Sequence, residues 1–219
     1  MPRALFEKTG MAAYISHLDL MRLFQRSFKR AGLPLTHTKG FNPRPSVSIA
    51  LPMSLGVESL CELLDFDLET ESFTCEEIQE RLNSTLTEGV RILDVYEDGA
   101  KIKHLAYLSC ELTLEYNAGV PENTIERIQE LFALPEIIVE KKGKNGVTEQ
   151  NIIPMIQKIR IVEQNPQELL LDAVICCQNP TLNPSQLVAA IAKYLPDCVP
   201  DFVRICRKEI FNTEKAIFR

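Results

Sequence analysis

The sequence predicts an α+β protein built from two tandem ferredoxin-like units, each with an antiparallel sheet. The first half alternates strand and helix patterns in the order β-α-β-β-α-β, which is the split unit of ferredoxin-like folds. The second half repeats this order less regularly. A length of 219 residues suits two domains of about 100 residues each. The predicted units are residues 1–98 and 104–219, with the boundary near Asp98 to His104.

The elements of the first unit are predicted from periodicity and from start and stop signals. Thr74 and Glu77 form a capping box at the start of the second helix, and Gly89 ends that helix before the next strand. The predicted elements are a strand from Arg3 to Lys8, a helix from Ser16 to Ala31, strands from Ser46 to Leu51 and from Cys61 to Leu68, a helix from Thr74 to Leu86, and a strand from Val90 to Tyr96.

The second unit is predicted from similar signals. Pro184 suits the first position of a helix, and Asn145 followed by Gly146 is a strong hairpin signal. The segment from Ile152 to Val162 is expected to be extended or irregular. The other elements are strands from Tyr107 to Tyr116, Ile137 to Lys142, Leu169 to Cys176 and Phe202 to Phe211, and helices near Pro121 to Leu134 and from Pro184 to Leu195.

The first predicted helix has one apolar face and one cationic face. Ser16 is the predicted N-cap, with Asp19 three residues later. At 100° per residue, the apolar residues Leu20, Phe24, Phe28 and Ala31 share one side. The basic residues Arg22, Arg26, Lys29 and Arg30 gather on the other side. This cationic face is either a phosphate-binding surface or a solvated helix face.

The loop that follows, HTKGFNPRPS, is predicted to be stiff. Gly40 permits a left-handed turn, while Pro43 and Pro45 each fix φ. A stiff loop would present four side chains for recognition: Lys39, Phe41, Asn42 and Arg44. A rigid turn into the next strand explains the prolines equally well. It explains an exposed Phe41 between two cations less well.

Four segments of this region, YISHLDLMR, KRAGLP, GFNPRPSVSIA and LGVES, resemble the signature of a bacterial domain family. Members of this family are found beside radical SAM proteins that carry a cobalamin-type domain, or fused behind them. The resemblance is strongest over Arg3 to Leu68 and becomes one of general architecture afterwards. It implies a radical SAM protein as a partner more clearly than it implies a reaction.

Charge is unevenly distributed along the chain. The first 50 residues hold eight of the 24 basic residues and two of the 30 acidic residues, a local charge of +6, and the remaining 169 residues carry −12. A basic end on an acidic protein can bind phosphates at one surface and still resist non-specific association. This distribution favours RNA as a partner despite the net charge of −6.

The seven cysteines have no spacing that suits a metal or a cluster. A radical SAM cluster requires three closely spaced thiolates, typically C-x3-C-x2-C. We therefore expect an iron–sulfur cluster and S-adenosylmethionine only in the partner, and neither a cofactor nor a metal in this chain. The thiols are interpreted as reduced and packed, as in a cytosolic protein. No apolar run approaches the ~20 residues of a membrane span and no signal peptide is evident, so we expect a cytoplasmic protein without membrane contact.

His17, in the first turn of the first helix, has two interpretations. Tandem ferredoxin-like domains are the plan of the endoribonucleases that trim CRISPR repeat RNA, where a catalytic histidine often lies near the first helix. A neutral His17, with His37 in the basic loop, would cleave RNA without a metal. Against this, the C-terminal region lacks the glycine-rich segment of those nucleases, and His17 lies beside Leu20 and Phe24 on the wheel. The second interpretation is structural, with the ring bonded to a carbonyl or to Asp19.

Three functions follow. The first is a non-catalytic RNA-binding or substrate-presenting partner of a radical SAM enzyme, in RNA or ribosome modification. The second is a metal-independent RNA-processing enzyme that uses His17, and the third is an adaptor whose basic patch meets an acidic protein. Glu58 is predicted to pair with Arg22 or Arg26 and, with Asp19, to support the surface. The predicted RNA-binding residues are Arg22, Arg26, Lys29, Arg30, Lys39, Phe41, Asn42 and Arg44.

Overall fold

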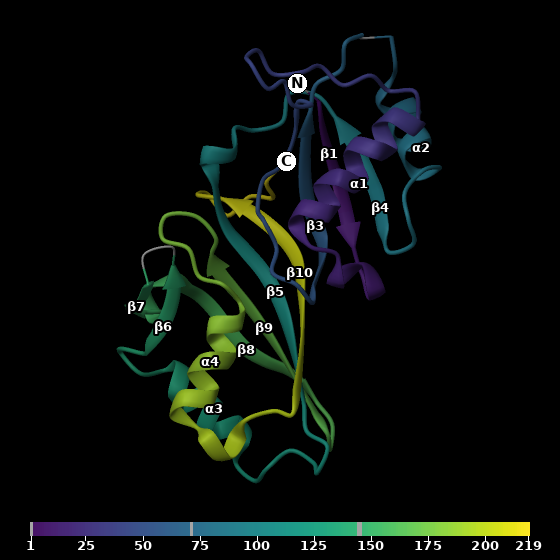
Figure 1. Cartoon of the computed structure of the whole chain (residues 1–219). Helices are drawn as coiled ribbons and strands as arrows, with labels where there is room; N and C mark the ends of the chain where they lie inside the picture. The colour runs from purple at the N-terminus through teal and green to yellow at the C-terminus, as the bar shows by residue number, and fades with distance from the viewer. Residues whose placement is uncertain (1, 71, 144–145) are drawn as a thin grey trace. The chain divides into compact units, whose positions relative to one another are not determined.

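The structure is a computed structural model that describes residues 2–70, 72–143 and 146–219 (Figure 1). The chain divides into two compact units. The first contains the residues up to Ile102 together with Arg219, and the second runs from Lys103 to Phe218. The fold is α+β, and the strand pairs within each unit are antiparallel. No helix of the described residues has the length and apolar content to cross a bilayer.

The first unit has the element order β-α-β-β-α-β. Its sheet has the order β4-β1-β3-β2, because Leu64 of β3 pairs with Ala4 on one side and with Ile49 on the other. A short 3-10 helix, η1 (Gly10–Tyr14), follows the first strand. The elements are β1 (Arg3–Lys8), α1 (His17–Arg30), β2 (Val47–Ile49), β3 (Val57–Phe66), α2 (Cys75–Asn83) and β4 (Val90–Tyr96).

The second unit has the same strand order with one hairpin inserted. Its main sheet has the order β10-β5-β9-β8, whereas β6 and β7 form a separate two-stranded sheet between α3 and β8. Lys144 and Asn145, part of the predicted turn, lie outside the described residues. The elements are β5 (Leu105–Glu115), α3 (Thr124–Phe132), β6 (Ile138–Gly143), β7 (Gly146–Asn151), β8 (Ile156–Gln164), β9 (Glu168–Cys176), α4 (Ser185–Tyr194) and β10 (Phe202–Asn212).

The strand that completes the main sheet differs from the sequence-based expectation. The segment from Ile137 to Lys142 was the clearer strand pattern, yet it forms one arm of the separate hairpin. The edge of the main sheet is β8, within a region expected to be extended or irregular. Irregularities in the pairing of β8 lie between Ile156 and Lys158 and between Ile161 and Glu163. Such breaks interrupt the period of two by which a strand is recognised.

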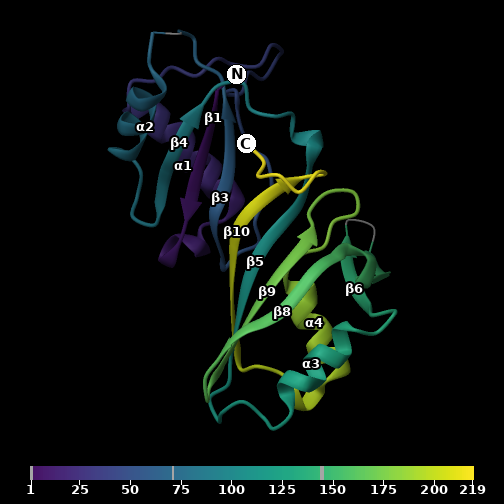
Figure 2. The same cartoon turned by 180° about the vertical axis from the view of Figure 1, so that it is seen from behind.

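In each unit the helices cover one face of the sheet. Figure 1 shows α1 in front of β1 and β3, and α3 and α4 in front of the second sheet. Figure 2 shows the opposite faces without helices. In the first unit, Phe6 of β1 meets Phe24 of α1 with ring centroids 4.9 Å apart, and Phe28 meets Phe66 of β3 at 5.0 Å. All four rings are fully buried.

Gly89, just before β4, occupies a position that excludes any side chain. Its φ is +81°, and a Cβ would lie 2.5 Å from the carbonyl oxygen of Thr9 and 2.9 Å from the Cβ of Ala12. The same two backbones are joined by the Thr9 N–H, which donates to the Gly89 carbonyl at 2.8 Å. Gly89, which the sequence predicted to end the second helix, thus lies beyond the end of α2 at Asn83, at a close approach between η1 and β4.

We predict that Gly89→Ala lowers the free energy of unfolding by about 2 kcal/mol or more, because left-handed strain and a backbone clash act together. Gly10→Ala is the matched control, since Gly10 has φ +57° but open space around its Cβ. The control should lose about 1 kcal/mol. Urea denaturation of both variants measures the difference, and equal losses would show that the clash is relieved at no cost.

Candidate nucleic-acid interface

Helix α1 begins with a side-chain cap that also organises its first cation. Ser16 has extended backbone angles, and its Oγ accepts a bond from the Asp19 N–H at 3.2 Å. The same hydroxyl donates to the Asp19 carboxylate at 2.7 Å, and Arg22 Nη1 donates to it at 2.9 Å. These bonds, Ser16 first and Arg22 second, lower the pKa of Asp19 below its ordinary value. Asp19 therefore positions Arg22, a pair that the sequence did not predict.

The apolar and cationic residues of α1 lie on different faces of the helix, as the helical wheel predicts. Leu20, Phe24 and Phe28 are buried, while the four basic residues of the helix are exposed. Arg30 is committed to the fold, because its Nη2 donates to the Thr85 carbonyl between α2 and β4. Since Arg22 is paired with Asp19, the two helix cations without a hydrogen bond or an ion pair to the described residues are Arg26 and Lys29. We call Arg26 and Lys29 the helix cations.

The loop after α1 is closed at its base by paired backbone. The Thr38 N–H donates to the Arg44 carbonyl at 2.9 Å, and the Arg44 N–H donates to Thr38 Oγ1 at 3.0 Å. Below this pair, the Ser46 N–H donates to the Thr36 carbonyl at 2.8 Å. Thr36 Oγ1 donates to the carboxylate of Asp67, just after β3, at 2.9 Å. A small hairpin fixed to the end of the sheet therefore carries the tip.

The tip of this hairpin projects into solvent. Phe41 is 111% exposed relative to its reference state, so it makes no packing contact that would account for an aromatic residue. Lys39, Asn42 and Arg44 are also exposed, and the side chains of Lys39 and Arg44 form no ion pair with the described residues. We call Lys39, Phe41, Asn42 and Arg44 the loop tip. Asp67, which helps to hold it, was not singled out from the sequence.

His17 and His37, the two histidines considered as an acid–base pair, lie at the two ends of α1 in the sequence. His17 opens the helix and His37 follows its end. A helix of 14 residues is about 21 Å long, so the two imidazoles are not brought together by this element. His17 is half-buried and makes no side-chain hydrogen bond within the described residues, whether to a carbonyl or to Asp19. The acid–base pairing of His17 with His37 has no support from this arrangement.

Glu58, near the start of β3, has a different partner from the predicted one. Its Oε1 accepts a bond from the Gly10 N–H at 2.6 Å, whereas the carboxylate that pairs with Arg22 is that of Asp19. The difference arises because η1, which the sequence did not predict, brings Gly10 to the start of β3. Glu58 therefore anchors η1, and the predicted pair with Arg22 or Arg26 is wrong.

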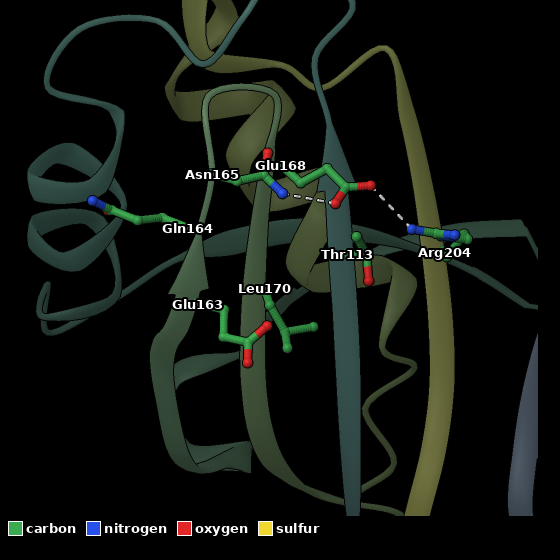
Figure 3. A pocket seen from close by; sticks show the side chains of 7 residues that line it. All are labelled: Thr113, Glu163, Gln164, Asn165, Glu168, Leu170 and Arg204. Atoms are coloured by element: carbon green, nitrogen blue, oxygen red, sulfur yellow. Dashed lines mark hydrogen bonds and ion pairs between the residues drawn. The ribbon is translucent and has the colours of Figure 1, made fainter.

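The face of the second sheet that no helix covers carries cross-strand ion pairs, which sequence analysis missed. Arg204 of β10 pairs with Glu115 and Glu168, and Lys208 pairs with Glu111. A hollow of about 400 Å³ lies on this face, where Glu168 bonds to both Asn165 and Arg204 (Figure 3). The sequence signal that could have revealed these ion pairs is the alternation of charged and apolar residues in β5 and β9. Arg204 and Lys208 are paired with carboxylates, so they are less available to an anionic ligand than exposed cations without a partner would be.

The cysteines are thiols, and burial governs their acidity. All seven are free, and five of them are buried. Burial raises the pKa of both Cys110 and Cys177 to about 12, so neither is a thiolate at neutral pH. Among the described residues, no three His, Cys, Asp or Glu side chains are grouped as metal ligands.

Comparisons with known proteins give one family and a set of distant structures. The family model described as "Uncharacterized protein conserved in bacteria (DUF2344)" matches residues 2–184. No curated protein matches this chain significantly. A chain in the crystal structure of a Cbf5-Nop10-Gar1 complex is similar with a TM-score of 0.53 and 11% identity, over 95% of this chain and 48% of that chain. A chain of the archaeal box H/ACA sRNP Nop10-Cbf5 complex gives a TM-score of 0.48 and 10% identity, over 94% and 46%.

The similarity to the chain of the Cbf5-Nop10-Gar1 complex shows the fold alone, because the identity is 11%. This chain spans about half the length of each of these two chains.

We predict that Ser16→Ala raises the pKa of Asp19 towards its ordinary value, because the largest cause of the lowered pKa is the hydrogen bond from Ser16. Since a lowered pKa in the folded state stabilises above the unfolded pKa, the contribution of Asp19 should be lost as the pH falls through its folded pKa. An NMR titration of the Asp19 carboxyl carbon measures the shift. An identical pKa in wild type and Ser16→Ala would contradict the assignment.

Proposed function

The chain belongs to the DUF2344 family, and we propose that its first unit binds single-stranded RNA and presents it to a radical SAM partner. We also assign both units to the ferredoxin-like architecture, on the strand order that they share. The observation that carries the proposal is the loop tip, where a fully exposed Phe41 stands between Lys39 and Arg44 on a closed hairpin.

An exposed aromatic ring beside cations is suited to an unpaired base. Stacking on an aromatic side chain contributes about 1–3 kcal/mol per base, and it requires a base that is not inside a duplex. Lys39 and Arg44 are positioned on either side of Phe41 in sequence to bind the flanking phosphates. Because the hairpin is closed by Thr38 and Arg44 backbone bonds, little conformational entropy is lost when the tip binds.

The helix cations extend the basic surface of the same unit. Arg26 and Lys29 are exposed and keep their donors available, and they lie about 4.5 Å apart along the helix axis. The first 50 residues carry +6 while the rest of the chain carries −12, so an RNA backbone would be steered to this unit. These features support RNA in preference to an acidic protein, since an unpaired base and its flanking phosphates would use the exposed ring and the neighbouring cations together.

The role of presenting a substrate rests on two points. The segments that resemble the signature of a family found beside radical SAM proteins include the loop tip and α1. In addition, the described side chains of the basic surface do not bring together a nucleophile, a base and a group that orients the base. In this proposal the chain holds the RNA, while the partner supplies the iron–sulfur cluster, S-adenosylmethionine and the radical chemistry.

The test is binding of a fluorescein-labelled RNA hairpin with a seven-nucleotide unpaired loop, compared with a fully paired duplex of equal length. Phe41→Ala should weaken binding of the looped RNA about tenfold and leave the weak duplex binding unchanged. Phe41→Trp should retain affinity. Equal binding of both RNAs, or a Phe41→Ala variant with full affinity, would refute stacking at the loop tip.

A second prediction concerns the helix cations. The double variant Arg26→Glu with Lys29→Glu should weaken RNA binding and lower the slope of log K against log salt by roughly 0.7 per lost phosphate contact. Arg91→Glu is the matched control, because Arg91 is an exposed cation of the same unit on β4, outside the proposed surface. Equal losses in the two variants would indicate non-specific charge attraction only.

The enzyme alternative is tested separately. If His17 were a general base, His17→Ala would remove RNA cleavage by a factor of ~10² to 10⁴ and leave affinity intact. We expect instead no cleavage of the hairpin RNA by the wild type in EDTA, and a loss of stability of order 1 kcal/mol in the variant. Cleavage products that vanish with His17→Ala would replace the proposed function by the nuclease.

A further inference from the structure

The second unit contains a strand edge that lacks a partner. β6 pairs with β7 along one side, and its other side pairs with no strand of the described residues. At Ile138 this outer edge is occupied by α4, because the Ile138 N–H donates to Tyr194 Oη at 3.1 Å and Lys193 Nζ donates to the Ile138 carbonyl at 3.0 Å. Both polar backbone groups of Ile138 thus point away from β7 and towards α4.

The backbone N–H and C=O groups point away from β7 at every second residue of β6. Because backbone groups alternate along an antiparallel ladder, the N–H and C=O of Glu140 and of Lys142 also point away from β7. Among the described residues, no side chain of α4 is bonded to them, and Tyr194, the last residue of α4, is bonded to Ile138. Within the described part of the chain, these groups of Glu140 and Lys142 form no hydrogen bond, and an edge of this kind is a template for strand addition.

A groove of about 820 Å³ runs along this edge. Val139 and Lys141 form one wall, and Ser185, Ala189 and Ala192 of α4 form the other. Small side chains on the helix leave space for an extended backbone. This groove belongs to the inserted hairpin, which has no counterpart in the first unit.

Gln186 places a buried amide donor in the lining of the groove. Its side chain lines the groove and the residue is only 8% exposed. Oε1 accepts bonds from the Asn183 N–H at 3.1 Å and from Gln150 Nε2 at 3.3 Å. Nε2 is buried and has no hydrogen-bond acceptor among the described residues. A buried amide donor without an acceptor costs stability, and a ligand carbonyl would recover this cost once the Gln186 amide turned towards the groove.

The charges around the groove select the ligand. Lys141 Nζ and Lys193 Nζ donate to the carbonyls of Thr181 and Ile138, at 3.4 and 3.0 Å, and to no carboxylate of the described residues. Two ammonium charges face one carboxylate of the lining, that of Glu140. An acidic side chain on the ligand would complete this balance.

We propose that the groove between β6 and α4 binds an extended, acidic segment of a protein partner, which adds as a strand to the outer edge of β6. Main-chain bonds to Glu140 and Lys142 would hold the segment. Its carboxylate would meet Lys141 or Lys193, and one of its carbonyls would accept from Gln186. The site is separate from the RNA surface of the first unit.

The full chain should be probed with a random 12-residue peptide library displayed on phage, followed by anisotropy of the enriched peptides. We expect acidic peptides that bind at least tenfold more tightly than the same peptides with lysine in place of the acids. Glu140→Pro should weaken them at least tenfold, because proline removes an outward N–H without breaking a bond to β7.

Glu149→Pro is the matched control. Glu149 lies opposite Glu140 on β7, so its N–H also points out of the hairpin, on the side away from the groove. It should leave peptide binding unchanged, as should Phe41→Ala of the RNA surface. Ala189→Phe should block the groove and weaken binding to a similar degree as Glu140→Pro.

Three results would overturn the proposal. They are a library without peptides that depend on Glu140, equal effects of Glu140→Pro and Glu149→Pro, and a homodimer by light scattering that Glu140→Pro dissociates. The third would assign the groove to a second copy of the chain.

Discussion

The packing of two phenylalanines of α1 against the first sheet is the contact on which the candidate RNA surface depends. Phe24 and Phe28 are seated on Phe6 and Phe66 with centroid distances of 4.9 and 5.0 Å. Side chains leave a helix at fixed angular intervals, so seating these rings also sets the direction of Arg26 and Lys29. Rotating the helix to hide the cations would expose two rings, at about 1.5–3 kcal/mol each.

Sequence reasoning succeeded where the signals were local. The Ser16 cap, the buried stripe of α1 and the Thr74 capping box depend on residues within one or two turns, and the structure contains all three. The exposed Phe41 was also predicted, because Pro43 and Pro45 restrict the backbone and Gly40 permits a left-handed turn, which are both local steric effects. Residues close in sequence carry enough information for features of this kind.

Features that depend on distant residues were not predicted. Glu58 bonds to Gly10, 48 residues away, and Asp67 holds Thr36 across 31 residues. Neither contact leaves a periodic trace in the sequence. β8 was obscured because two irregularities break its alternation, and the β6 edge becomes recognisable only when α4 is seen to cap Ile138 and nothing beyond it. Register and pairing partners are properties of the assembled sheet.

The closed base of the loop has a consequence for how this protein can diversify. The backbone hydrogen bonds that close the loop lie at its base, and they join Thr38 to Arg44 and Ser46 to Thr36. The side chains of the tip contribute nothing to the buried core. Substitutions at Lys39, Phe41 and Asn42 therefore leave folding unaffected, so that ligand preference at this point can change by mutation without a penalty in expression or solubility. Two chains with identical cores can in this way serve different ligands.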